Sequence, residues 1–159
     1  MAGVTVIIND AEVMAKLKQL SALNSRAMLD EIGSYMQSVT KKRFKDSTGP
    51  DGKQWLPLAP RTLLARAGGR KAAKKGGSLT AKPLIDRGHL MASITYQVGS
   101  DHVAIGTNMI YGAIHQFGGM AGRGRKVKIS ARPFLGVSPE NRAEILDIMT
   151  DYVEQELRK

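Results

Sequence analysis

Apolar residues in the first third of the chain are spaced in two different ways. β-Branched residues alternate over residues 3–8, GVTVII, with the period of two that is typical of a strand. Residues 10–20 then carry apolar side chains at helical spacing, after an Asn-Asp pair that can cap a helix. Residues 25–45 predict a second, longer helix. Its apolar stripe consists of Met28, Ile32, Tyr35, Met36 and Val39.

Proline and glycine divide the middle of the chain into short elements. GPDG at residues 49–52 predicts a type I turn, with Pro in the second position and Gly in the fourth. Pro60 can begin a short helix that ends at Gly68 and Gly69. Residues 84–93 are expected to form a short turn or helix.

The next part of the chain reads as a hairpin, a helical segment and a strand. Residues 94–107 predict a hairpin whose turn is the Ser-Asp pair in its middle. Residues 109–117 predict a helical segment in which Phe117 faces inward. Residues 126–130, KVKIS, predict a short strand with its lysines on one face, followed by a second extended piece over 134–138.

A helix over residues 139–157 closes the pattern, and its start is strongly marked. Ser138 can cap it, Pro139 fits its first turn and Glu140 complements the helix dipole. Its apolar stripe consists of Ile145, Ile148, Met149, Tyr152 and Val153. These elements together predict an α+β fold, with a small antiparallel or mixed sheet packed by two long helices and a long basic loop at residues 68–82.

Composition limits the classes of protein that the sequence can encode. The chain has 159 residues, a length that suits one domain over residues 1–159. Cysteine is absent, which excludes disulfides, thiolate metal sites and cysteine nucleophiles. No apolar run approaches the ~20 residues that span a bilayer, and the N-terminus lacks the pattern of a signal peptide. We therefore expect a cytosolic product with no membrane partner.

The net charge of +10 is concentrated in two glycine-rich segments. Residues 61–87 hold eight basic residues and one acid, and residues 120–133 hold five basic residues and no acid, whereas the C-terminal segment is acidic. Such asymmetry suggests a polyanion or an acidic partner surface, and a merely solvated loop is the alternative. The candidate contact residues are Arg70, Lys71, Lys74, Lys75, Arg123, Arg125 and Lys126.

The basic loop at residues 68–82 has almost no large apolar residue and cannot be held by packing of its own. Because fixing a residue costs roughly 1–2 kcal/mol in backbone entropy, we expect this loop to become ordered only in an assembly. A neighbouring subunit, an acidic partner or DNA is the expected contact. Neither basic segment contains an aromatic residue, so base stacking is not expected there.

Two further features have a structural and a nucleic-acid interpretation. Trp55 lies between two prolines, and we interpret it as an anchor that pins an extended loop to the core, with base stacking as the alternative. Lys41, Lys42, Arg43 and Lys45 suit the negative end of the helix dipole as solvated residues, with phosphate contact as the alternative.

No pattern of catalytic chemistry stands out in the sequence. His89, His102 and His115 lie thirteen residues apart, so no pair has the i, i+4 spacing of a zinc helix. Neither a nucleophile elbow nor a phosphate loop is present. We interpret His102 as lacking an acidic partner and His115 as a structural histidine with satisfied hydrogen bonds, with a triad of distant residues as the alternative. No enzymatic activity, metal or cofactor is expected.

Four segments share their order and content with a known family. They are FKDSTGPDGKQWLPL at 44–58, LIDRGHLMASI at 84–94, VAIGTNMIYGAIHQFGG at 103–119 and KISARPFLGVSPEN at 128–141. The motif residues within them include Trp55, Tyr111, His115, Gln116, Arg132 and Phe134. In this combination the chain resembles the phage virion morphogenesis family, also called phage tail completion proteins, as found in Mu-like contractile-tailed phages.

The resemblance implies a small α+β subunit of the phage neck or tail top, which acts where head and tail are joined. It implies a homo-oligomeric ring, a hexamer by analogy with contractile tails, that contacts neighbouring neck, connector or tail-tube proteins. It assigns no catalytic residue, and its motif residues look structural. The expected location is the virion, with the host cytoplasm during assembly. The competing hypothesis is a non-specific DNA-binding accessory protein that acts through the basic loops, for example on DNA in the channel.

Overall fold

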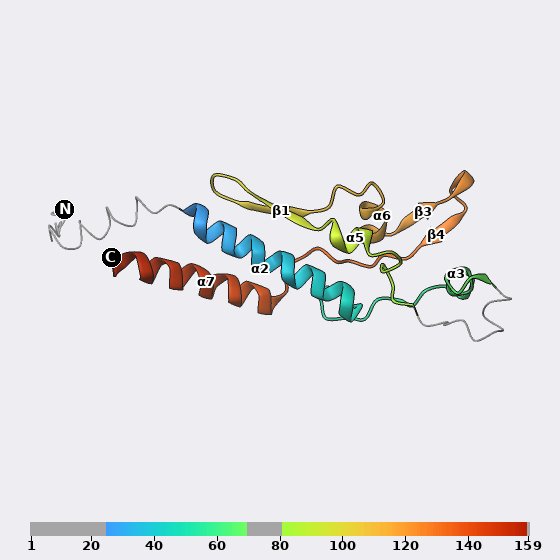
Figure 1. Ribbon diagram of the computed structural model, residues 1–159, viewed down its shortest axis with the longest axis horizontal. Helices are drawn as coiled ribbons and strands as arrows, with labels where there is room; N and C mark the ends of the chain where they lie inside the picture. Colours follow the sequence, from blue (N-terminus) through green and yellow to red (C-terminus); the bar gives the residue numbers. More distant parts are fainter. Residues whose placement is uncertain (1–24, 70–80, 159) are drawn as a thin grey trace, which may run out of the picture.

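The computed structural model describes residues 25–69 and 81–158. The strand predicted at 3–8, the helix predicted at 10–20 and residues 70–80 of the basic loop lie outside the described residues. Figure 1 shows an elongated molecule, with two long helices at one end and short elements at the other. No helix among the described residues is long and apolar enough to cross a membrane.

The first long helix, α2, spans Ser25–Asp46, close to the predicted bounds. Its buried side is shifted from the predicted stripe: Ile32 and Met36 are buried, but the other three members are only half-buried. The shift arises because two elements pack on α2 from different sides, the first hairpin and the last helix. The buried residues are Leu29, Ile32, Gly33, Met36, Thr40, Arg43 and Phe44.

The last helix, α7, spans Pro139–Leu157, as predicted, and runs antiparallel to α2 at its side (Figure 1). The Ser138 hydroxyl accepts a hydrogen bond from the Asn141 N–H, and the Asn141 side chain accepts one from the Ser138 N–H, both at 3.2 Å. This reciprocal pair forms a capping box, which fixes the start of the helix. Met149, predicted to face inward, is instead 39% exposed, because it lies at the flank of the side that packs on α2.

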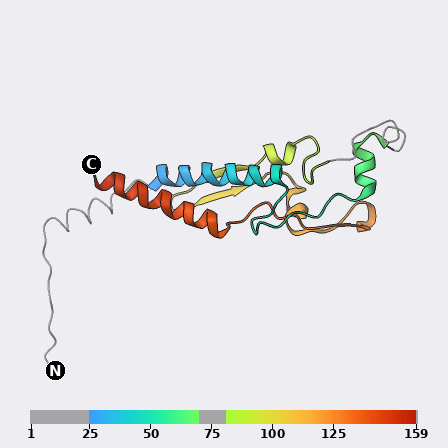
Figure 2. The same cartoon turned by 90° about the horizontal axis from the view of Figure 1, so that it is seen from below.

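The first hairpin consists of β1 (Thr95–Val98) and β2 (Val103–Gly106), in the predicted place. The Gly99 N–H donates to the carbonyl of His102 at 2.8 Å and closes the turn. The hairpin lies along α2 (Figure 2), and the two approach most closely at Gly33, where a Cβ atom would lie 2.3 Å from the Tyr96 ring. Glycine at this position therefore lets the helix and the hairpin pack closely.

Short elements form the other end of the molecule. They are α3 (Pro60–Arg66), α5 (His89–Ala92), α6 (Gly112–Phe117), β3 (Gly119–Ala121), the 3-10 turn η1 (Arg123–Arg125) and β4 (Val127–Ile129). β3 and β4 pair antiparallel, so the second basic segment is the turn of a hairpin. The strand expected over 126–130 is confirmed, whereas β3 is an addition that its Gly-Met-Ala sequence does not predict.

Phe117 differs from its prediction, because its side chain is 79% exposed instead of facing inward. α6 has only six residues and ends at Gly118, whose φ is 74°. A Cβ atom at Gly118 would lie 2.9 Å from the backbone nitrogen of Ala131. The backbone after α6, not the Phe117 ring, therefore packs against the segment that follows β4.

The hydrophobic core lies where the C-terminal end of α2 meets the segment after β4. It consists of Phe44, Trp55, Leu90, Ile94 and Phe134. The Phe44 ring contacts the Trp55 ring edge-to-face at a centroid distance of 5.7 Å and the Phe134 ring at 5.2 Å. The described residues thus form a single small α+β domain with two separate two-stranded antiparallel sheets, and neither sheet is mixed.

Candidate interaction surfaces

The centre of the molecule is built around an extended segment, residues 132–136, that belongs to neither sheet. The side chain of Gln116 in α6 forms hydrogen bonds with the backbone of this segment, in the place of a neighbouring strand. Its Oε1 atom accepts hydrogen bonds from the N–H groups of Phe134 and Leu135 at 2.9 and 3.0 Å. Its Nε2 atom donates to the carbonyl of Leu135 at 3.0 Å. One side chain thus satisfies three backbone groups that would otherwise lack a partner.

Arg132 and Trp55 connect the same segment to the loop before α3. Arg132 is buried, and its guanidinium donates to the carbonyls of Leu56 and Pro57 at 2.9 and 3.0 Å. In return, the Trp55 indole N–H donates to the carbonyl of Pro133 at 2.9 Å. Trp55 is 7% exposed, which is the placement of a packing anchor and leaves no ring face free for a base.

Arg43 lies at the centre of these contacts. The interpretation of Arg43 as a solvated residue was wrong. Its side chain is buried, not solvated at the helix end. It donates to the carbonyls of Phe134 and Gly136 at 3.0 and 2.8 Å and to Asn141 Oδ1 at 2.6 Å. Burial lowers the pKa of Arg43, and the three acceptors compensate part of the lost hydration. Arg43 thereby joins α2 to the start of α7.

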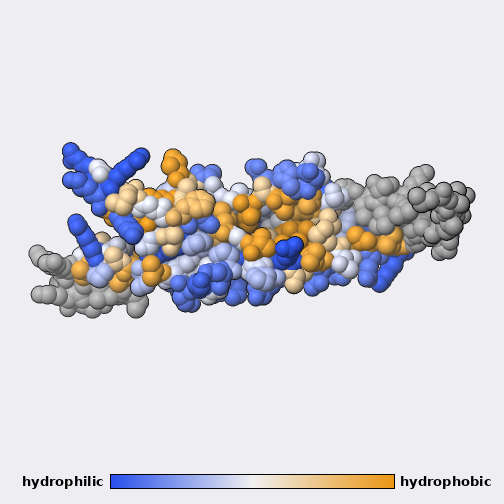
Figure 3. Space-filling view, turned by 180° about the vertical axis from the view of Figure 1, so that it is seen from behind, coloured by the Kyte–Doolittle hydropathy of each residue, from blue (hydrophilic) through white to orange (hydrophobic). Residues whose placement is uncertain are grey.

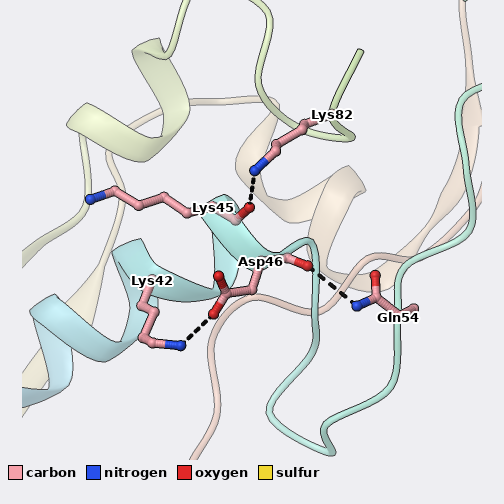
Figure 4. Close-up of polar contacts among 5 residues, drawn as sticks. All are labelled: Lys42, Lys45, Asp46, Gln54 and Lys82. Atoms are coloured by element: carbon pink, nitrogen blue, oxygen red, sulfur yellow. Dashed lines mark hydrogen bonds and ion pairs between the residues drawn. The ribbon is translucent and has the colours of Figure 1, made fainter. Parts of the chain in front are cut away.

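The other cations at this helix end stay at the surface and make local contacts (Figure 4). Lys42 forms an ion pair with Asp46 at 2.5 Å. Lys82, the last residue of the basic loop, donates to the carbonyl of Lys45, and Gln54 donates to that of Asp46 at 3.4 Å. These contacts tie the end of α2 to the loops around it.

His115 and Tyr111 lie on the side of α6 next to Arg132. The Tyr111 ring is 42% exposed and meets the His115 ring edge-to-face at 6.0 Å. His115 Nδ1 is buried and has no hydrogen-bond partner among the described residues, so the prediction of a satisfied histidine is wrong. Burial, and then the positive charge of Arg132, lower the pKa of His115. A neutral ring is thus favoured.

The remaining two histidines lie in different elements, His102 beside the turn of the first hairpin and His89 in α5. His102 has an acidic neighbour after all, because its Nδ1 atom lies 2.8 Å from an oxygen of Asp101 at the exposed hairpin turn. This contact lowers the pKa of Asp101. His89 lines a groove beside β4. In residues 25–69 and 81–158, no three His, Asp or Glu side chains come together in a way that could hold a metal ion.

That groove has a volume of about 730 Å³. It lies between the loop before α3, the segment that leads into α5, and β4. Most of its lining is apolar, and Arg66, Arg87, Lys128 and Arg132 add positive charge. Asp86 also lines it and lies 3.6 Å from Arg66.

The β3–β4 hairpin carries the second predicted basic set. Arg123, Arg125 and Lys126 are exposed, and none of them forms an ion pair with another described residue. Figure 3 shows hydrophilic side chains projecting at this end and apolar side chains gathered over the middle of the face. The first predicted set lies outside the described residues. Its members are Arg70, Lys71, Lys74 and Lys75.

The outer side of α7 is acidic and lies at the opposite end of the molecule (Figure 1). Glu144, Asp147 and Asp151 are exposed and form no ion pair with another described residue. Leu146, on another side of the same helix, is 53% exposed. The described chain thus has a basic end and an acidic end.

Comparisons with known proteins relate the chain to proteins of virion assembly. The model of the phage virion morphogenesis family matches residues 8–154. The chain is 29% identical to the putative capsid assembly protein G of Escherichia phage Mu over 157 residues, which cover 97% of the chain and 96% of that protein. It is 52% identical to the Mu-like prophage FluMu G protein 2 of Haemophilus influenzae over 87 residues, 55% of the chain and 63% of that relative's length. No solved structure matches the chain.

Proposed function

The chain belongs to the phage virion morphogenesis family and is a virion assembly protein of a Mu-like phage; on that premise we propose that it is a structural subunit of the neck or tail top. In this role it forms a homo-oligomeric ring, with six subunits favoured, that completes the tail and helps to join it to the head. Its partners are the neighbouring neck, connector or tail-tube proteins.

The observation that carries this proposal is the separation of charge along the subunit. The exposed cations of the β3–β4 hairpin lie at one end of the long axis, and the exposed acids of α7 lie at the other (Figure 1). A ring of identical subunits needs two different surfaces that meet head to tail. Opposite charges at opposite ends provide such a pair, and they favour association in one orientation.

A phage that encodes this chain allows a direct test by deletion of the gene. Lysates are inspected by electron microscopy, and filled heads, free tails and joined virions are counted. We expect heads and tails in normal numbers but no joined virions, and the gene supplied from a plasmid restores joining. Joined virions in normal numbers without the protein would contradict the proposal.

A second candidate function is a role in assembly of the head. It is favoured by the printed name of the phage Mu relative, a putative capsid assembly protein. The same lysates distinguish the two roles, because a head-assembly protein leaves aberrant or absent heads beside normal tails when it is deleted.

The DNA-binding alternative predicts a different property of the purified protein. The dissociation constant for duplex DNA is then about micromolar or weaker at physiological salt. Binding weakens steeply as the salt concentration rises. The ring proposal instead predicts a fixed number of copies in each purified virion. Quantitative mass spectrometry of virions measures that number.

A further inference from the structure

The sheet formed by β1 and β2 ends, among the described residues, at the outer edge of β2. The bond from the Gly99 N–H to the carbonyl of His102 shows which residues of the hairpin are bonded to each other. Bonded and non-bonded pairs alternate along an antiparallel ladder, so Ala104 is bonded to β1. The N–H and C=O groups of Val103 and Ile105 therefore point away from β1. An edge of this kind accepts a further strand through backbone hydrogen bonds.

The outer edge of β2 lies on the side of α7. By the same alternation, the carbonyl of Ile94 points away from β2, and it accepts a hydrogen bond from Gln37 of α2 at 2.8 Å. Tyr35 of α2 instead bonds to Asn141 of α7 at 3.0 Å. Gln37 and Tyr35 lie on nearly opposite sides of α2, because two helix positions differ by about 200°. β2 is therefore between β1 and α7, and Figure 2 shows the hairpin between the two helices.

α7 carries an apolar stripe that its packing on α2 does not cover. Of the nineteen residues of α7, all of them described, only Asn141 is buried. Leu146, Met149 and Val153 follow one another at spacings of three and four residues, so they lie on one stripe. Leu146 and Met149 are 53% and 39% exposed, and Val153 is half-buried. Arg142, one turn before Leu146, marks the end of the apolar part of the stripe.

The stripe on α7 faces the same side of the helix pair as the hairpin does. It lies about 90° around α7 from Ile145 and Tyr152, which are on the side that packs on α2. Because α7 is right-handed and runs antiparallel to α2, this rotation points toward the hairpin, and the acidic row points away from it. Helices pack about 8–10 Å apart and strands about 4.8 Å apart, so two helices side by side have room for about four strands on one face. The hairpin supplies two.

We propose that residues 3–8 of the same chain, GVTVII, add to the outer edge of β2 as an antiparallel strand and cover the stripe on α7. The alternation of this segment turns Val4, Val6 and Ile8 toward the helices. The segment has no charged residue, so it matches an apolar surface. Residues 70–80 do not match it, because they hold four basic residues and one leucine.

The length of chain before α2 allows this pairing within one subunit. β1 runs antiparallel to α2, since Ile94 bonds to Gln37 and Tyr96 bonds to Asp30. β2 therefore runs in the direction of α2, and a strand antiparallel to β2 ends beside the start of α2 at Ser25. Sixteen residues, 9–24, connect the two and reach up to about 50 Å when extended. This inference does not depend on the proposed ring.

The absence of cysteine from the chain makes disulfide cross-linking a direct test. Ala104 is exposed on the outer face of the hairpin and forms a non-bonded pair with the added strand. Cα atoms in such a pair are about 4.5 Å apart, which suits a disulfide. Ala104→Cys is combined in the full chain with Gly3→Cys, Thr5→Cys or Ile7→Cys, the three outward positions of the strand. On oxidation, at least one pair should close within a single chain, which then migrates faster on a non-reducing gel.

Two controls define the expected pattern. Val6→Cys with Ala104→Cys should not close, because Val6 faces the helices. Thr5→Cys with Gln97→Cys should not close, because Gln97 lies opposite Ala104 on β1, one strand farther from the proposed site. Closure of neither control, with closure of an outward pair, supports the proposal. Covalent multimers in place of the closed monomer overturn it, because the strand then comes from another copy.

Hydrogen exchange tests the same contact without cysteine. In the unmodified protein, the amides of Val103 and Ile105 should be protected by the added strand. Val4→Asp with Val6→Asp puts charge against the apolar stripe and should speed their exchange at least about tenfold. Thr5→Asp is the matched control on the outward face and should leave their exchange unchanged. Fast exchange of both amides in the unmodified protein, or unchanged protection in the double variant, overturns the proposal.

Discussion

The centre and the β3–β4 end of this molecule use their polar and apolar groups in opposite ways. In the centre, Phe44 and Phe134 have no exposed surface, and buried Arg43 donates three hydrogen bonds. At the other end, Phe117 is 79% exposed and Ile110 is 98% exposed. The centre is buried by contacts within the described chain, whereas the end presents apolar side chains that the other described residues leave exposed.

The largest loss of stability is expected from Trp55, which connects the two regions. Trp55→Ala should lower the free energy of unfolding by about 3–5 kcal/mol, the usual cost of deleting a buried large aromatic side chain. Trp55→Phe keeps most of the packing but loses the hydrogen bond to Pro133 and should cost about 1–2 kcal/mol. Chemical denaturation followed by circular dichroism measures both. Equal effects of the two variants would contradict the anchor role.

A somewhat smaller loss is expected at Arg43. Arg43→Met fills a similar volume but removes the buried hydrogen bonds to Phe134, Gly136 and Asn141, at a cost of about 2–4 kcal/mol. Lys42→Met is the matched control, because its exposed ion pair with Asp46 contributes at most about 0.5 kcal/mol. Similar denaturation midpoints for the two variants would show that the buried contacts do not stabilise the centre.

The sequence predicted the long elements well because their signals are local. Ser138 and Pro139 mark the start of α7 through backbone groups within one turn, and the structure begins the helix there. The first hairpin, between β1 and β2, was predicted equally well, since alternation and a polar turn specify it locally. Sites that depend on distant contacts were predicted less well.

Arg43 and Phe117 are two residues whose burial was predicted wrongly for this reason. A cation in the last turn of a helix suits the dipole, and the acceptors that bury Arg43 come from residues about ninety positions away. The sequence did contain one signal that Arg43 is buried. Arg43 lies seven residues, or two helical turns, after Met36, on the buried side of α2. The periodicity of α6 placed Phe117 inward, but a helix of six residues has too few turns for periodicity to define a buried side.

A smaller effect is expected from a decrease in pH, which should lower the free energy of unfolding. Burial and the charge of Arg132 lower the pKa of His115 from its ordinary value of 6.5. The unfolded chain therefore takes up a proton at a higher pH than the folded chain does. Stability should be full above pH 6.5 and should fall as the pH decreases below it. His115→Gln should flatten this part of the stability profile, and an unchanged slope would show that His115 does not cause it.

The smallest effect on stability is expected at the exposed end. Phe117→Ser should change the free energy of unfolding by less than about 0.5 kcal/mol, because the ring is 79% exposed and contributes little to the fold of its own subunit. Ile114→Ser in the same helix is the matched control, and it should cost more because Ile114 is half-buried. Under the proposed function, Phe117→Ser should still reduce the number of joined virions, because an exposed apolar ring is available for a contact with another protein. Thermal unfolding of the purified variants and particle counts from complemented lysates separate the two effects. A loss of stability as large as that of Trp55→Ala would show that the ring is held by its own chain and that the contrast between the two regions is wrong.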